Sequence, residues 1–224
     1  IPAKDPSFGL DALWIDPSNR ESAQTAGYTV VDCSTVVATH LSQILKNNAA
    51  KLVGQDDVQQ LLDRLKQNAP KLVENLVPGV MSLADVTRVI HSLLDEGVPI
   101  RDMRTIAETL SLQRGSDKSP DEMVSQVRVA LGPSIFQSVT GQAHELPVMV
   151  LDPQLEQIMG NAIQNNNGVI EPNLLDTVVT GISEGSGKME AEGASPVLLV
   201  SGAIRGFLAR LLRGRMANFY ILAY

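Results

Sequence analysis

One short motif in the sequence could supply a nucleophile. Residues Gly181–Gly185 have the G-x-S-x-G spacing of the nucleophile elbow of α/β hydrolases. In that elbow the serine stands on a sharp turn between a strand and a helix, and a histidine follows it later in the chain. Here a helical pattern of apolar residues leads into the motif, and no histidine follows His144. A small serine hydrolase that uses Ser183 is therefore the disfavoured alternative.

A phosphate loop, a metal centre and a cysteine nucleophile are also disfavoured. The run Gly185-Ser186-Gly187-Lys188 has Ile182 where the first glycine of a phosphate loop belongs, and Met189 where the magnesium-binding hydroxyl belongs. The three histidines lack the spacing of paired metal ligands, and Cys33 is the only cysteine. We expect no catalytic residue, no metal and no cofactor.

The composition is that of an ordinary globular protein. The chain has 224 residues, of which 44% are hydrophobic and 19% charged, which suits one large domain or two to three small ones. A net charge of −7 disfavours general binding to nucleic acid. A single cysteine excludes an internal disulfide framework and is typical of a reducing compartment. No apolar run reaches the roughly 20 residues of a membrane-spanning helix. Because the sequence starts at Ile1 without Met or a signal-peptide pattern, we expect a segment of a longer protein.

The first predicted elements form a short β-α-β segment. Residues 12–15 are a short apolar run that predicts a strand. Asp16 followed by Pro17 is typical of a helix start, and Gly27 of its end. Residues 28–31 are β-favouring and predict a second strand. Because one such unit is too small for a domain, we expect its other strands to precede residue 1.

A long helical stretch follows. Residues 34–132 repeat apolar residues at helical spacing, which predicts a series of amphipathic helices. Ser82 with Asp85 resembles a capping box, and Ser119-Pro120-Asp121-Glu122 is typical of a helix start. The sequence therefore predicts an all-helical central subdomain.

The last part of the chain alternates between strands and helices. We expect Gly132 to end the last helix of the central subdomain. Strands are predicted at 148–151, 196–200 and 219–222, and helices between them begin at Asp-Pro or Glu-Pro pairs. The predicted fold class is therefore an α/β protein of several subdomains, with a small α/β layer at the end.

The C-terminal segment is basic. After Glu192 the chain has no acidic residue but has four arginines, at positions 205, 210, 213 and 215. This pattern is typical of a solvated helix face. The alternative interpretation is that the arginines form a basic contact for an acidic neighbour or subunit.

Stretches spread along the whole chain carry a family resemblance. They are residues 3–10, 12–15, 27–31, 37–41, 60–65, 70–78, 98–106 and 196–200. Together and in this order they resemble the cytoplasmic domain of the FHIPEP family, the export-gate proteins of type III secretion. The segment Ala38-Thr39-His40-Leu41 favours the flagellar branch over the virulence branch.

The resemblance implies an architecture of four cytoplasmic subdomains. Residues 1–32 would be part of the second subdomain, and 33–52 a helix that returns to the first. Residues 53–132 would be the helical third and 133–224 the α/β fourth subdomain. Glycines at positions 185, 187 and 193 depart from the family pattern and put the length of one helix of the fourth subdomain in doubt.

The resemblance also implies a function without enzymatic activity. Family members lie in the bacterial inner membrane, and this part would face the cytoplasm as a docking platform of a nonameric ring. The platform receives flagellar export chaperones with their bound substrates and helps to switch between substrate classes. Other partners would be the export switch protein and the stalk of the ATPase complex, and the membrane would be contacted only through an absent N-terminal part. The alternative is a purely structural ring subunit.

By match to the family's motifs, the chaperone-binding site would contain Asp5, Phe8, Val36 and Thr39. An aromatic ring and a valine can form an apolar socket, while an aspartate and a threonine at its rim orient a partner helix. Taken singly, Phe8 and Val36 would be interpreted as core residues, Asp5 as a turn cap and Thr39 as an incidental helix residue.

Overall fold

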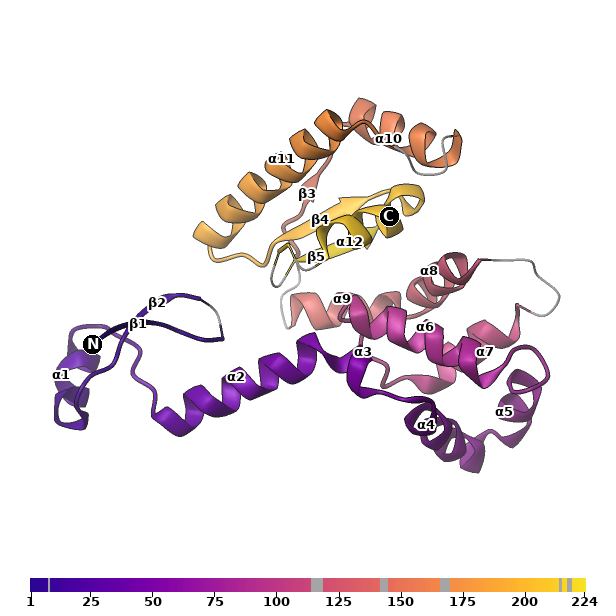
Figure 1. The fold of residues 1–224 in the computed structure, drawn as a ribbon, viewed down its shortest axis with the longest axis horizontal. Helices are drawn as coiled ribbons and strands as arrows, with labels where there is room; N and C mark the ends of the chain where they lie inside the picture. Colours follow the sequence, from indigo (N-terminus) through magenta and orange to yellow (C-terminus); the bar gives the residue numbers. More distant parts are fainter. Residues whose placement is uncertain (8, 114–118, 142–144, 166–169, 214, 217–218) are drawn as a thin grey trace. The chain divides into compact units, whose positions relative to one another are not determined.

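The computed structural model describes residues 1–224 except 8, 114–118, 142–144, 166–169, 214 and 217–218 (Figure 1). The chain divides into two compact units, Ile1–Val53 and Gly54–Tyr224.

The first unit begins with a β-hairpin. Strands β1 (Pro2–Lys4) and β2 (Asp11–Leu13) pair antiparallel, with Ala3 opposite Ala12. The backbone N–H of Asp5 donates to the carbonyl of Leu10 at 2.8 Å and closes the connecting turn. Gly9 has a φ of +71° in that turn, a conformation that glycine adopts at little cost.

Helices make up the rest of the first unit. A 3-10 turn over Pro17–Asn19 leads into α1 (Arg20–Thr25), and the Asp16 carboxylate accepts a hydrogen bond from the Ser18 N–H at 2.9 Å, as the sequence predicts. The hydrogen bonds from Ser18 also lower the pKa of Asp16. Helices α2 (Cys33–Asn47) and α3 (Ala49–Leu52) complete the unit.

The predicted β-α-β segment is only partly formed. Its first strand is present as β2, but its partner is the neighbouring β1 and not a strand over residues 28–31. Residues 28–31 form no strand, and Tyr28 and Val31 are exposed. The prediction of a strand there is wrong for this structure, because β-favouring side chains form a strand only where another strand lies beside them.

The second unit starts with a bundle of six helices. They are α4 (Gln55–Asn68), α5 (Pro70–Leu76), α6 (Leu83–Asp95), α7 (Met103–Ser111), α8 (Pro120–Ala130) and α9 (Gly132–Thr140). Both predicted helix starts are confirmed: Ser82 Oγ accepts from the Asp85 N–H at 3.1 Å, and Ser119 forms a capping box with Glu122, which accepts from the Ser119 N–H at 2.7 Å. The core contains fully buried side chains, among them Val58, Leu62, Leu76, Ile90, Leu93, Ile106 and Leu110.

The bundle extends further than the sequence indicates. Helix α8 ends at Ala130, just before Gly132, as the sequence predicts. A further helix that the sequence pattern did not predict, α9, begins at Gly132 and continues to Thr140. Pro133 stands in the first turn of α9, where its missing N–H leaves no hydrogen bond unmade, so a Gly-Pro pair can start a helix.

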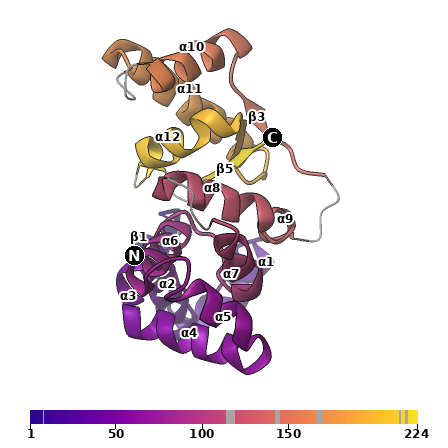
Figure 2. The same cartoon turned by 90° about the vertical axis from the view of Figure 1, so that its right-hand side faces the viewer.

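A small α/β layer follows the bundle. It contains β3 (Met149–Val150), α10 (Pro153–Asn165), α11 (Pro172–Ala191), β4 (Val197–Val200), α12 (Gly202–Leu212) and β5 (Tyr220–Ala223). The strands form a parallel sheet in the order β3-β4-β5. Strand β4 lies in the middle and is almost fully buried, as its continuous apolar sequence predicts. Figure 2 shows α12 of this layer next to α8 of the bundle.

The glycines at 185 and 187 do not interrupt α11, which runs for 20 residues. A Cβ atom at Gly185 would meet the sulfur of Met149 at 3.4 Å, an ordinary van der Waals distance, so α11 lies beside β3 at this point. The helix ends before Gly193, which has a φ of +75°. The doubt about the length of this helix is thereby resolved.

The basic C-terminal segment contacts acidic groups of the same chain. Arg205 Nη1 lies 2.5 Å from Glu96 Oε2, and Arg210 Nη1 lies 2.6 Å from Asp121 Oδ2. Arg213 pairs with Asp95. The acidic neighbour of α12 is therefore the helix bundle itself.

Candidate docking site

The predicted docking residues of α2 lie near its start. The Asp32 carboxylate caps the helix by accepting hydrogen bonds from the Thr35 N–H at 2.7 Å and from Ser34 Oγ at 2.9 Å. These hydrogen bonds lower the pKa of Asp32. Val36 and Thr39 follow three residues apart, so they share one face of α2, and both are half-buried.

Asp5, another predicted residue, belongs to the hairpin turn. Asp5 Oδ1 accepts a hydrogen bond from the Ser7 N–H at 2.8 Å, and the Asp5 carbonyl accepts one from the Gly9 N–H at 2.8 Å. Asp5 is half-buried and holds the turn in shape. Phe8 lies outside the described residues. The structure thus places Val36 and Thr39 together on α2 and Asp5 in the turn, while the four-residue site as a whole stays a prediction.

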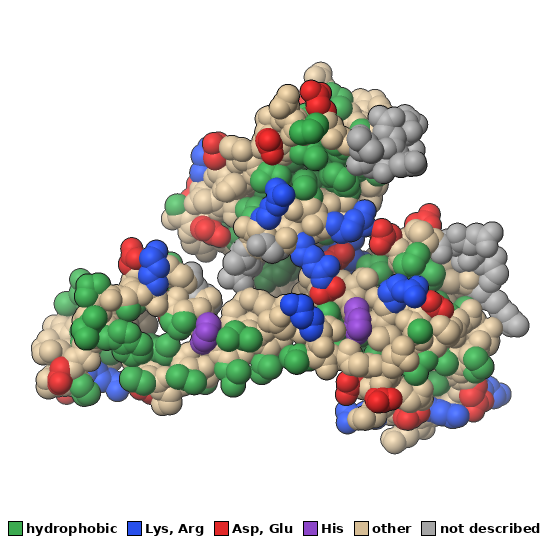
Figure 3. Space-filling model, viewed as in Figure 1, with side chains coloured by type: hydrophobic (Ala, Val, Ile, Leu, Met, Phe, Trp, Pro, Cys, Tyr) green, Lys and Arg blue, Asp and Glu red, His purple; other side chains and the backbone are tan. Residues whose placement is uncertain are grey.

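The surface of this unit is apolar to a high degree. Helix α2 is amphipathic, yet none of its 15 residues is buried. Val37 and Leu41 are 66% and 53% exposed, and Trp14 of the hairpin is 48% exposed. Other exposed apolar residues of the unit are Ile1, Leu10, Leu13, Ile15, Tyr28, Val31, Ile44, Leu45 and Leu52. Figure 3 shows hydrophobic side chains gathered over the hairpin and along α2, and an apolar surface of this kind is typical of a face that packs against further protein.

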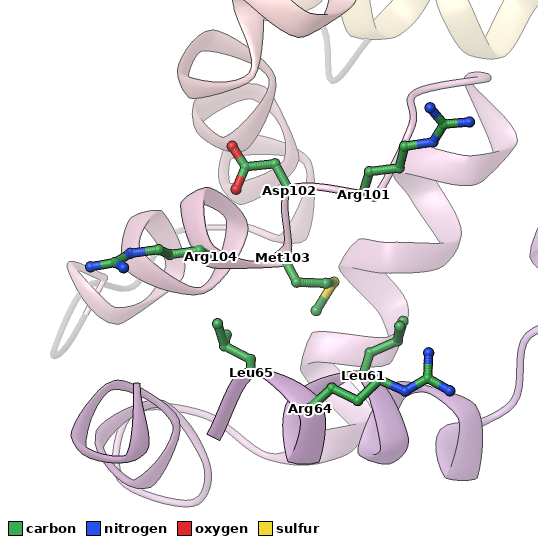
Figure 4. A pocket seen from close by; sticks show the side chains of 7 residues that line it. All are labelled: Leu61, Arg64, Leu65, Arg101, Asp102, Met103 and Arg104. Atoms are coloured by element: carbon green, nitrogen blue, oxygen red, sulfur yellow. The ribbon is translucent and has the colours of Figure 1, made fainter. Parts of the chain in front are cut away.

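A hollow lies on the surface of the bundle between α4 and the start of α7 (Figure 4). It has a volume of about 380 Å³ and is lined by Leu61, Arg64, Leu65, Arg101, Asp102, Met103 and Arg104. Asp102 caps α7 by accepting hydrogen bonds from the Thr105 N–H at 3.0 Å and from Thr105 Oγ1 at 2.6 Å, which lower its pKa. Figure 4 shows the Met103 side chain directed toward Leu61. Sequence reasoning missed this hollow, although the stretch 98–106 that lines part of it carries the resemblance.

The structure contradicts the nucleophile elbow. Residues Gly181–Gly185 lie in the middle of α11, and Ser183 is exposed on that helix. A nucleophile elbow needs a strand before the serine and a sharp turn at it. The Gly185–Lys188 run lies in the same helix and forms no phosphate loop. His144, the last histidine, lies outside the described residues.

Within the described part of the chain, no group of three or more His, Cys, Asp or Glu residues could hold a metal ion. No helix in it is both long and apolar enough to cross a membrane. Cys33 is exposed in the first turn of α2.

Comparison with known proteins gives one consistent result. The chain is 46% identical, over 98% of its length, to flagellar biosynthesis protein FlhA of Escherichia coli strain K12. The fold matches Chlamydia pneumoniae CdsV in its complex with CdsO, with a TM-score of 0.81 and 19% identity, over all of this chain and 66% of that one. It also matches the nonameric EPEC SctV-C, with a TM-score of 0.77 and 22% identity, over 93% of this chain and 64% of that one.

The chain covers 32% of the length of E. coli FlhA, about a third. The profile of the FHIPEP family matches residues 1–224, every residue of the chain. This full-length match, together with the identity to FlhA, shows that the chain belongs to the FHIPEP family.

Proposed function

We propose that this chain is part of the cytoplasmic docking platform of the flagellar type III protein export gate. On this proposal it binds export chaperones with their substrates and helps to switch the substrate class. The observation that carries the proposal is the 46% identity to FlhA over 98% of this chain. The placement of Val36 and Thr39 on one face of α2 supports it.

The chemistry of the site fits a partner helix. Val36 offers an apolar contact beside Thr39, whose hydroxyl can donate or accept one hydrogen bond. The exposed apolar residues Val37 and Leu41 continue the surface along α2. A partner that buries this surface gains about 25 cal/mol for each Å² of apolar area removed from water. Asp5 of the hairpin turn belongs to the proposed site, and so does Phe8, which lies outside the described residues.

The oligomeric state is a second part of the proposal. EPEC SctV-C, a protein of the same fold, is nonameric, and CdsV of the same fold forms a complex with CdsO. We propose that this chain contributes to a nonameric ring on the cytoplasmic side of the bacterial inner membrane. The export switch protein and the stalk of the export ATPase would be its other partners.

Calorimetric titration tests the docking site. The complete cytoplasmic domain is titrated with a flagellar chaperone bound to its filament-type substrate, as wild type and as Asp5→Ala, Phe8→Ala, Val36→Ala and Thr39→Met. We expect binding by the wild type and at least tenfold weaker binding by the variants, with unchanged circular dichroism. Val129→Ala is the matched control for Val36→Ala, because Val129 is 79% exposed on the bundle. Equal binding by all variants would show that the docking site does not contain these four residues.

A purely structural ring subunit is the competing function, and the nonameric state of EPEC SctV-C favours it. Measuring both ring assembly and chaperone binding distinguishes the two functions. A structural subunit assembles into rings, measured by mass photometry, but shows no heat of binding with any chaperone–substrate complex. A docking platform both assembles into rings and shows heat of binding.

A further inference from the structure

The bundle and the α/β layer of the second unit have separate apolar cores. In the described part of the chain, the apolar cluster of the α/β layer consists of residues between 149 and 221 only. Its buried centre includes Leu198, Val200, Ile204 and Leu208. The fully buried residues of the bundle, such as Leu62 and Ile90, are not part of it. Each body therefore keeps its own hydrophobic stabilisation if the two come apart.

Ion pairs cross the contact between these two bodies. Glu96 at the end of α6 stands between Arg205 of α12 and Arg128 of α8. Arg205 binds the carboxylate with both terminal nitrogens, at 2.5 and 3.2 Å. Arg128 Nη1 lies 2.8 Å from Glu96 Oε2, and Arg128 Nη2 donates to the carbonyl of Ile221 in β5 at 3.2 Å. Two more pairs, Arg210–Asp121 and Arg213–Asp95, lie at its edge.

The central cluster carries more positive than negative charge. One carboxylate serves two guanidinium groups, whose side chains are only 6% and 10% exposed. Arg128 Nη1 lies close to Glu96 but is not aligned for a hydrogen bond. Burial and the repulsion of Arg205 lower the pKa of Arg128 to about 10. The attraction within such a cluster offsets the loss of hydration only narrowly, so removing the carboxylate leaves buried charge that favours separation of the two bodies.

We propose that Glu96 holds a reversible ionic latch with Arg128 and Arg205, and that the α/β layer leaves the bundle as a folded body when the latch opens. The latch places β5 and α12 against α8 in the closed state. This proposal concerns the second unit alone and does not depend on the docking site of the first.

Distance measurements on the chain test the latch. Spin labels on Gln67→Cys in α4 and Glu184→Cys in α11, in a Cys33→Ser background, report the distance between the two bodies by pulsed electron resonance. Both positions are exposed. We expect one narrow distance distribution for the otherwise unchanged chain. Glu96→Gln should raise the ratio of open to closed molecules about a hundredfold, because it leaves two buried cations without their carboxylate.

Two further variants complete the test. Glu108→Gln is the matched control, since Glu108 pairs with the exposed Arg104 on its own helix, and it should keep the narrow distribution. The triple variant Glu96→Met, Arg128→Met and Arg205→Met makes the contact apolar and should restore the closed distance.

Three results would overturn the latch. One is a narrow distribution for Glu96→Gln that equals the control. Another is a triple variant as open as Glu96→Gln. The third is loss of the whole circular-dichroism signal in Glu96→Gln, because the bundle and the α/β layer would then unfold together and would not be separate bodies.

Discussion

Helices α2 and α6 have the same kind of sequence and opposite surroundings. Both repeat apolar residues at helical spacing, and both begin at a side chain that caps the first turn. In α6 Val86, Val89, Ile90 and Leu93 are buried, whereas α2 has no buried residue. The difference arises because α6 packs on α4 and α8. An amphipathic stripe thus predicts a helix and an apolar face, but not whether that face meets the same chain or another protein.

The largest expected effect on stability comes from truncating one isoleucine to alanine in each of the two helices. Ile90 is fully buried in α6, and Ile44 is 44% exposed in α2. Ile90→Ala should lower the free energy of unfolding by about 2–5 kcal/mol, since it leaves a cavity. Ile44→Ala should change it by less than about 0.5 kcal/mol. Urea unfolding followed by circular dichroism measures both, and equal losses would break the comparison between the helices.

A smaller effect should come from the cap of α7. Asp102→Ala should cost about 1 kcal/mol at pH 7, because the carboxylate accepts hydrogen bonds from Thr105. Since these bonds lower the pKa of Asp102 in the folded state, their contribution is present above the ordinary pKa near 3.8 and is lost as the pH falls through the folded value.

The pH dependence can be checked by thermal unfolding. The difference in Tm between wild type and Asp102→Ala should be largest at pH 7 and should shrink below pH 4. Asp102→Asn keeps a capping side chain without the charge and serves as the control. A Tm difference that stays constant from pH 7 to pH 3 would show that the ionised carboxylate is not what caps α7.

The smallest effect concerns the single tryptophan. Trp14 lies in the first unit and is 48% exposed, so its fluorescence reports on that unit. Acrylamide should quench it readily in the free chain. Ile90→Ala, which weakens only the second unit, should leave its emission maximum unchanged. A shift of the maximum in that variant would show that the two units do not fold independently.

Local sequence signals predicted most of the helices correctly. Ser82 and Ser119 start α6 and α8 as capping residues, because hydrogen bonds within one turn decide where a helix begins. The buried strand β4 was equally clear, because four consecutive apolar residues fit the middle of a parallel sheet.

Other elements depended on neighbours that a local pattern does not contain. Residues 28–31 have strand-forming side chains but no strand beside them, and β1 forms because its chain turns back onto β2. The role of the arginines in α12 could not be predicted either, since Glu96 lies 109 residues before Arg205. The docking residues came from the family resemblance, because Val36 and Thr39 alone have no distinctive chemistry.

Amide hydrogen exchange, with and without a chaperone–substrate complex, tests the proposed docking surface most directly. Helix α2 and helix α4 are the two segments to compare. The account predicts that the partner slows exchange in residues 33–47 and leaves residues 55–68 unchanged. Slower exchange confined to residues 54–224, with none in α2 or the hairpin, would contradict it.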